Sequence, residues 1–268
     1  REVNMPGWIQ TFPGGAEQAH SVTVTNGSKR LDMNFGNIAA VDFGDAPDSY
    51  GTTIAADGAS HGILPNLMLG LAVDAELNGL PTTNADGDDL NQTPDDEDGV
   101  RFENIFFPGS SSDISVTINT GTNAPARLNA WFDFNRNGVF TDSGEQMIVA
   151  DRKGSGTYTY TIQVPADAVP GLTYARFRYS YQGNIGPTGP ARDGEVEDYL
   201  VRILNNTPEA VDDSFTTNQD TNANQLQVLT NGESSVRGRI VITKTRIATR
   251  GGRVLIAADG TFVAYTPA

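Results

Sequence analysis

The chain has 268 residues, a formal net charge of −15 at pH 7 and no cysteine. The absence of cysteine excludes disulfides, cysteine–zinc sites and cysteine nucleophiles. The negative charge argues against nucleic acid and anionic lipid as partners and favours divalent cations. We expect no membrane insertion, because no run of about 18 apolar residues occurs, and no signal peptide, because the start at residues 1–4 lacks a charged-then-apolar pattern. We expect the chain to be part of a longer protein.

The first 38 residues predict two short strands. Apolar residues alternate over residues 21–25 and again over 31–35, and Asn26-Gly27 is a typical turn pair between them. The stretch from Gly7-Trp8 to Phe35-Gly36-Asn37 resembles the closing strands of collagen-adhesin B-type (prealbumin-like) surface domains. This resemblance implies that residues 1–38 are the C-terminal strands of such a domain.

The central region changes character along its length. Residues 39–104 are loop-rich and acidic, and between Leu31 and Val100 there are fourteen Asp and Glu but no Lys or Arg. Further on, alternating apolar residues predict five strands, which with turn-rich gaps indicate a β-sandwich. These strands cover residues 114–118, 128–134, 158–164, 175–181 and 199–203. The predicted fold is all-β, with tandem Ig-like or jelly-roll-like sandwiches.

The last part of the chain follows a predicted linker at residues 205–208. Residues 209–268 resemble bacterial cadherin-like or Ig-like repeats in four short motifs: Val211–Ser214, Gly252–Leu255, Asp259–Phe262 and Tyr265–Pro267. The usual Asn-Asp turn is replaced by residues 230–233, and we expect the unit to be incomplete. Six bases and no acid lie between Val236 and Arg253, in contrast to the acidic region before them.

The clearest chemical motif starts at Asp133. Asp133, Asn135 and Asn137 stand at relative positions 1, 3 and 5, and Gly138 follows at position 6. Oxygen ligands at these positions and a glycine turn form the cage that calcium needs. The Val139 carbonyl would be a fourth ligand, with Asp142 or Glu145 closing the site. Because strands flank this loop, we expect no EF-hand. The alternative is an Asn-rich turn without metal.

Acidic clusters surround this motif and predict an acidic layer organised by calcium. Gathering so many carboxylates without cations is electrostatically unfavourable, and the interspersed Gly and Pro allow tight folding. The alternative is a disordered, self-repelling segment. The additional candidate ligands are Asp42, Asp45, Asp48, Asp74, Glu76, Asp86, Asp88, Asp95, Asp96, Glu97, Asp98, Glu195, Glu197 and Asp198.

The same residues carry a second resemblance. The ordered segments DFGDAPDSYG (42–51), ASHG (59–62), LGLAVDAE (69–76), DDEDGV (95–100), WFDFNRNGVF (131–140) and GEVEDYLVRI (194–203) resemble a GEVED domain over residues 40–204. This resemblance implies a module of large bacterial surface and secreted proteins, found beside cadherin-like and B-type domains. No enzymatic activity is attached to the family.

Catalysis is weakly supported by the sequence. Glu195 with Glu197, or Asp96 with Asp98, could be a glycosidase pair, but such pairs usually face each other from different elements. His20 and His61 are the only histidines, and we expect His61 to form hydrogen bonds instead of binding metal.

We therefore predict a non-enzymatic structural or assembly module of a calcium-stabilised surface protein, adhesin or filament. Its expected partners are copies of itself or neighbouring domains, through open β-edges. The first alternative is an adhesin head that binds a glycan or a protein, with Trp8, Trp131, Tyr158, Tyr160, Tyr179 and Tyr181 as a possible sugar platform. A glycoside-active enzyme comes third.

Overall fold

The computed structural model describes the chain except residues 1, 4–7, 16, 28, 88–95, 122–123, 206–210, 219–220, 231–240, 247 and 249–250. It separates into two compact units, Arg1–Ile203 and Leu204–Ala268, each considered by itself. Within the described residues there is no helix that is long and apolar enough to cross a membrane.

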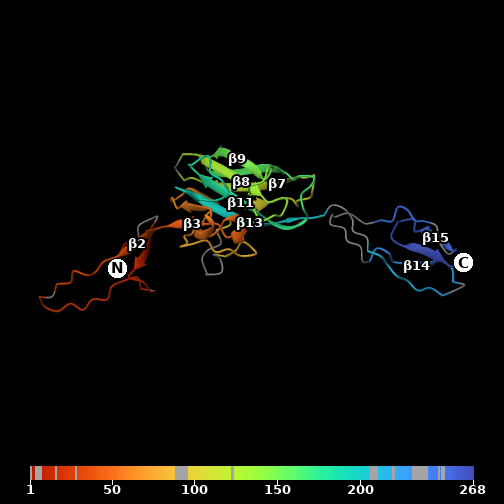
Figure 1. The fold of residues 1–268 in the computed structure, drawn as a ribbon, viewed down its shortest axis with the longest axis horizontal. Helices are drawn as coiled ribbons and strands as arrows, with labels where there is room; N and C mark the ends of the chain where they lie inside the picture. Colours follow the sequence, from red (N-terminus) through yellow and green to blue (C-terminus); the bar gives the residue numbers. More distant parts are fainter. Residues whose placement is uncertain are drawn as a thin grey trace. The chain divides into compact units, whose positions relative to one another are not determined.

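A β-sandwich forms most of the first unit (Figure 1), and the all-β prediction is confirmed. One sheet has the order β10-β7-β5, with β6 also pairing with β7. Its strands are β5 (Met68–Leu69), β6 (Val100–Phe102), β7 (Ser111–Asn119) and β10 (Gly156–Gln163). The other sheet has the order β13-β11-β8-β9. Its strands are β8 (Ala126–Phe132), β9 (Gln146–Lys153), β11 (Gly171–Ser180) and β13 (Glu195–Ile203).

Alternating apolar side chains from both sheets fill the core. Ile114, Val116 and Ile118 on β7 meet Phe177 and Tyr179 on β11, and all five are buried in one cluster. This is the pattern of strands whose one face is covered. All five strands predicted from alternation are present. Strand β9 was not predicted, because its sequence does not alternate between apolar residues that face the core and polar residues that face outward. Val149, for example, is apolar but 65% exposed.

A third layer covers the outer face of the β11–β13 sheet. We call it the loop layer and define it as residues 41–66, 70–87 and 96–99. It contains β3 (Val41–Phe43) and β4 (Ser60–Gly62), which form a small sheet with β12 (Pro190–Ala191), and two 3-10 turns, η1 (Asp48–Tyr50) and η2 (Ile54–Ala56). Its residues Ala46 and Tyr50 pack in a second buried cluster with Trp131 and Phe140. The described part of the acidic segment is thus packed, not self-repelling coil.

The N-terminal residues form a hairpin that differs from the prediction. Strand β1 (Trp8–Phe12) pairs with β2 (Gly36–Ala39), and the predicted strands at residues 21–25 and 31–35 are absent. The predicted turn at Asn26-Gly27 is present. The alternating residues there do not become strands because no layer covers them: Val24 is 82% and Leu31 78% exposed.

The second unit contains a three-stranded antiparallel sheet with the order β14-β16-β15. Its strands are β14 (Asn224–Leu226), β15 (Arg253–Ile256) and β16 (Val263–Thr266). Among the described residues of this unit, Val263 is the buried apolar one, whereas Leu255 is 48% exposed. Most of the predicted linker, residues 206–208, lies outside the described residues.

Candidate functional site

The loop after β8 brings the predicted calcium ligands together, starting with Asp133. The Asp133 side chain is fully buried. Its Oδ2 accepts hydrogen bonds from the Tyr50 hydroxyl (2.6 Å) and the Gly138 amide (2.9 Å), and its Oδ1 accepts one from the Asn137 amide (3.2 Å). Asp133 thus holds the loop closed from inside and links it to the loop layer through Tyr50.

The side-chain oxygens of the two asparagines also accept backbone hydrogen bonds within the loop. Asn135 Oδ1 accepts from the Asn137 amide (2.9 Å), and Asn137 Oδ1 accepts from the Val139 amide (3.1 Å). Such local bonds are typical of Asx turns. The backbone has positive φ angles at Arg136 (60°) and Gly138 (88°). Glycine suits position 138 because it adopts this left-handed conformation without strain.

Asp142 and Glu145 complete the loop. Asp142 Oδ2 accepts hydrogen bonds from the side-chain Nδ2 atoms of Asn135 (2.7 Å) and Asn137 (2.5 Å). Glu145 is buried, and its Oε1 accepts no hydrogen bond from the described residues. Burial raises the pKa of Glu145 to about 7, and the charges of Asp133 and Asp142 add to this.

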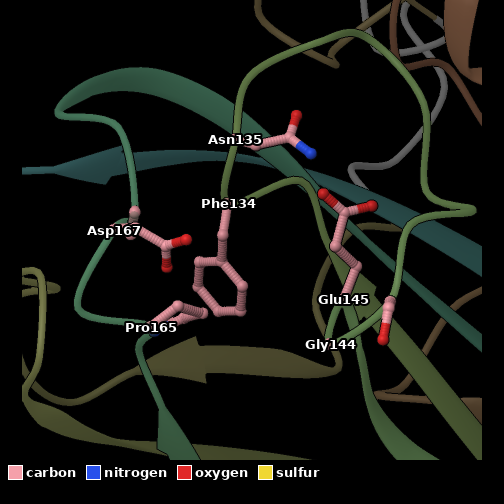
Figure 2. A pocket seen from close by; sticks show the side chains of 8 residues that line it. Phe134, Asn135, Gly144, Glu145, Pro165 and Asp167 are labelled. Atoms are coloured by element: carbon pink, nitrogen blue, oxygen red, sulfur yellow. The ribbon is translucent and has the colours of Figure 1, made fainter.

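A cavity of about 130 Å³ lies beside this carboxylate, lined also by Asn135, Pro165 and Asp167 (Figure 2). The loop therefore gathers Asp133, Asn135, Asn137, Asp142 and Glu145. Among the described residues, no three His, Cys, Asp or Glu side chains form a group that could hold a metal on their own. Two of the five side chains here are asparagines, so this loop is a mixed amide and carboxylate arrangement.

The other predicted ligands serve several local roles. Asp48 is exposed and accepts from the Thr53 amide (2.8 Å), and this bond lowers its pKa. Asp45 Oδ2 accepts from the Gly87 amide (2.6 Å), and Asp86 accepts from Thr82 and Asn84 within its own turn. Asp88 and Asp95 lie outside the described residues.

A second group of carboxylates lies where the loop layer meets β13. Asp42 Oδ2 accepts from the Val196 amide (2.6 Å), Asp96 Oδ2 from the Asp74 amide (3.0 Å) and Asp98 Oδ1 from the Leu71 amide (2.8 Å). Glu76 Oε2 accepts from the Phe43 amide (2.9 Å). Burial raises the pKa of Glu76 to about 11, with a hydrogen bond to Asp74 and the charges of Asp42 and Asp74 adding to the shift. Glu97 follows Asp96 in the same segment.

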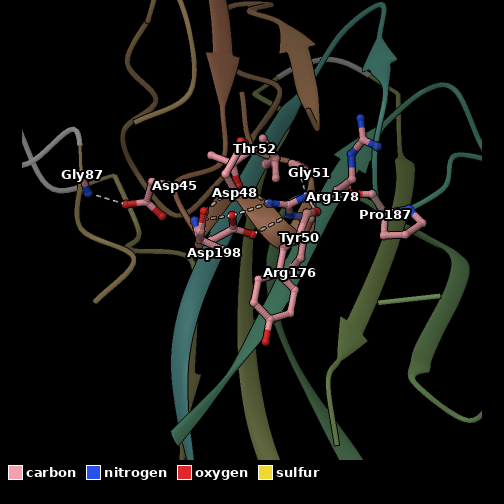
Figure 3. A network of polar contacts seen from close by, with 12 residues as sticks. Asp45, Asp48, Tyr50, Gly51, Thr52, Gly87, Arg176, Arg178, Pro187 and Asp198 are labelled. Carbon is pink, nitrogen blue, oxygen red and sulfur yellow. Dashed lines mark hydrogen bonds and ion pairs between the residues drawn. The ribbon is translucent and has the colours of Figure 1, made fainter. Parts of the chain in front are cut away.

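Two buried arginines on β11 carry positive charge into the acidic layer. Arg176 and Asp198 form a fully buried ion pair, with Nε to Oδ1 and Nη2 to Oδ2 both at 2.7 Å (Figure 3). Arg176 also donates to the backbone carbonyls of Tyr50, Gly51 and Pro187 at 2.7–2.9 Å. The acidic run has no Lys or Arg of its own, but arginines from a distant strand supply part of the missing positive charge. Since both Asp198 oxygens are paired, we leave Asp198 out of the proposed metal sites.

Arg178 plays a similar part next to His61. Its Nε donates to His61 Nε2 (2.9 Å), and its other nitrogens donate to the carbonyls of Gly186, Thr188 and Gly189 at 2.7–2.9 Å. Burial lowers the pKa of Arg178 to about 9, with the charge of Arg176 adding to the shift. Burial, then the charge of Arg178, lowers the pKa of His61 well below its usual value, so this ring is a neutral hydrogen-bond acceptor. His61 thus forms hydrogen bonds, as the sequence predicted.

The Asp133 loop (residues 133–145), both arginines and the Gly194–Asp198 segment all lie in the part of the chain that runs from β8 to the end of β13. Residues 127–202 match the model of the GEVED domain family. No curated protein and no solved structure matches the chain. The GEVED match covers the β8–β13 sheet and β10, a shorter part of the chain than the predicted 40–204. The loop layer, which lies before the match, supplies Tyr50 and Asp42 to it.

Proposed function

We propose that this chain is a non-catalytic structural and assembly module of a bacterial extracellular surface protein, adhesin or filament, and that calcium stabilises its sandwich. The Asp133 loop carries this proposal. It places three carboxylates and two amide side chains in one turn, and Glu145 contributes a buried oxygen without a hydrogen bond from the described residues. Calcium accepts such mixed oxygen shells and completes them with carbonyls and water.

Three further observations support a structural role. With no cysteine in the chain, disulfides cannot fix the long loops, and bound ions would add to the apolar packing and the Arg176–Asp198 pair that already hold them. The Glu195 and Glu197 carboxylates are 0% and 1% exposed, so a polysaccharide could not reach them as a glycosidase pair. Trp131 and Tyr179 are buried in the interior, which removes two of the aromatic residues from any sugar platform.

Asn137→Ala should weaken calcium binding at least about tenfold, because losing even an outer-shell partner of a metal site has that effect. Asn137 is exposed, so the fold should persist. The measurement is a calcium titration of the metal-free variant by calorimetry. Asn119→Ala is the matched control, since Asn119 makes the same kind of turn bond, to the Gly121 amide at 2.9 Å, outside the loop. Equal affinities for parent, Asn137→Ala and Asn119→Ala would refute a calcium site in this loop.

The assembly part of the proposal concerns the sheet edges. In the second unit β14 and β15 are the outer strands of their sheet, and Val241 and Leu255 are 44% and 48% exposed. Edge strands pair readily with strands from other chains. The acidic first unit and the basic stretch 236–253 add an attraction that salt would weaken.

We therefore expect end-to-end oligomers at low salt that shorten as salt is raised. Light scattering after size exclusion, over a salt series at constant calcium, measures this. A single monomeric mass at every concentration and salt level would contradict assembly through copies of this chain, while leaving the calcium proposal intact.

A further inference from the structure

Glu195 and Glu197 face the interior of the sandwich. In the β11–β13 pairing, Glu195 is opposite Tyr179 and Glu197 is opposite Phe177. Directly opposed residues of antiparallel strands point to the same side of a sheet, and Phe177 and Tyr179 belong to the hydrophobic core. The intervening Val196 and the following Asp198 point to the opposite, outer side, where Asp198 meets Arg176. The two glutamates are therefore carboxylates between the sheets.

Each glutamate has one oxygen satisfied and one that is not. Glu195 Oε2 accepts from the Leu69 amide on β5, and Glu197 Oε1 accepts from the Gly99 amide (2.8 Å) just before β6. Both bonds join β13 to the opposite sheet. The remaining oxygens, Glu195 Oε1 and Glu197 Oε2, are buried and accept no hydrogen bond from the described residues. Two fully buried, adjacent carboxylates with a vacant oxygen each are a costly arrangement unless protons or a cation neutralise them.

The surroundings provide more negative charge. Burial raises the pKa of Glu195 well above its usual value, and the neighbouring carboxylates Glu197, Asp42 and Asp96 raise it further. Burial likewise raises the pKa of Glu197; the Gly99 amide and the Tyr199 hydroxyl oppose this shift, and the charges of Asp98 and Asp96 add to it. The nearest arginines, Arg176 and Arg178, are on the outer side of the sheet and are engaged there.

The backbone is shaped around these oxygens. A Cβ on Gly99 would lie 2.8 Å from both oxygens of Glu197, so any other residue would intrude on the carboxylate. Gly70 has a positive φ of 54°, and a Cβ there would overlap Asp98 Oδ1. The Gly99 backbone thus closes on the Glu197 carboxylate just before β6, and the Gly70 backbone closes on the neighbouring Asp98.

We propose that Glu195 and Glu197 form a second divalent-cation centre, a calcium centre that joins the two sheets inside the sandwich and is separate from the Asp133 loop. This second centre rests on the proposed function, because both centres would bind calcium. Because no three acidic or histidine side chains among the described residues form a ready-made group, two carboxylates supply the charge, and backbone carbonyls and water complete the shell. The centre ties β13, an edge strand of one sheet, to β5 and β6 of the other.

The test compares glutamine variants with the parent. Glu195→Gln and the double variant Glu195→Gln/Glu197→Gln keep an oxygen that can accept the Leu69 and Gly99 amide bonds but remove the charge. Native mass spectrometry counts the calcium ions per chain, and thermal unfolding with and without calcium measures their effect. We expect both variants to bind one ion fewer than the parent and to show a smaller rise in Tm on calcium addition, with an unchanged or higher Tm in chelator.

The outcomes separate this centre from the proposed function. An unchanged ion count and an unchanged calcium-induced rise in Tm in Glu195→Gln would mean that protons neutralise the pair, and would overturn the second centre. If the parent binds calcium and the Asn137→Ala variant binds none, the Asp133 loop holds all the calcium of the chain, and the second centre is also refuted. A parent that binds no calcium would refute the proposed function itself. Should the double variant fail to fold, the single variant decides.

Discussion

Removal of calcium should lower the Tm of the first unit by about 5–10 °C relative to calcium-saturated protein. A ligand present at about 100 times its Kd stabilises the folded state by about 2.7 kcal/mol, and about 1 kcal/mol changes Tm by about 2–4 °C in a domain of this size. The effect is large here because the ions would neutralise buried carboxylates of the loop layer and the sandwich. Differential scanning calorimetry in chelator and in excess calcium measures it.

Magnesium is the control for this prediction. The same concentration of magnesium should give a much smaller rise in Tm, because its small octahedral shell suits these irregular oxygen arrangements poorly. A rise equal to that with calcium would show a general effect of divalent charge. Equal Tm values in calcium, magnesium and chelator would mean that ions do not stabilise the unit.

Arg176→Met should lower the free energy of unfolding by about 3–5 kcal/mol, the usual effect of removing one partner of a buried ion pair. Asp198 would keep the hydrogen bond from the Ala46 amide (2.9 Å) but lose its counter-charge, and three backbone carbonyls of the loop layer and the 186–189 turn would lose their donor. Chemical denaturation followed by tryptophan fluorescence measures the loss, since Trp131 is buried next to this network.

Arg101→Met is the matched control for this loss. The Arg101 side chain is 80% exposed and pairs with Glu103 at 3.4 Å on the surface, so its loss should change stability by less than about 1 kcal/mol. Similar losses in the two variants would show that the buried pair does not hold the loop layer in place. The Arg176→Met/Asp198→Leu double variant should recover part of the loss, because it removes the unpaired charge but not the unmet carbonyls.

The strands of the sandwich were predictable because their chemistry is local. Alternating residues such as Ile114, Val116 and Ile118 require only that one face be covered, and the second sheet covers it. The same alternation at residues 21–25 failed because nothing covers Val24. The Asp133 loop was equally local: its ligands are close in sequence, and the positive φ of Gly138 agrees with the expected turn.

The interior of the site could not be predicted from local sequence. Arg176 and Arg178 meet the acidic layer from more than 100 residues away, as the separations of 124–126 residues from Tyr50, Gly51 and Thr52 show. The sequence did hold a signal for the two arginines. They flank Phe177 on a predicted strand, so if Phe177 faces the core, both arginines must lie on the opposite face of the sheet. Glu195 and Glu197 precede the strand predicted at residues 199–203, and the register of β13 with β11 was needed to show that they share its core face.

Calcium binding to the metal-free chain is the most direct test of this account. Isothermal titration calorimetry of chelator-treated protein with calcium should show saturable binding of at least one ion per chain, with a Kd no weaker than about 10⁻³ M, the range of extracellular calcium modules. The same titration of Asn137→Ala should show the binding that belongs to the Asp133 loop weakened at least about tenfold. The absence of saturable binding by the correctly folded parent chain would contradict the account.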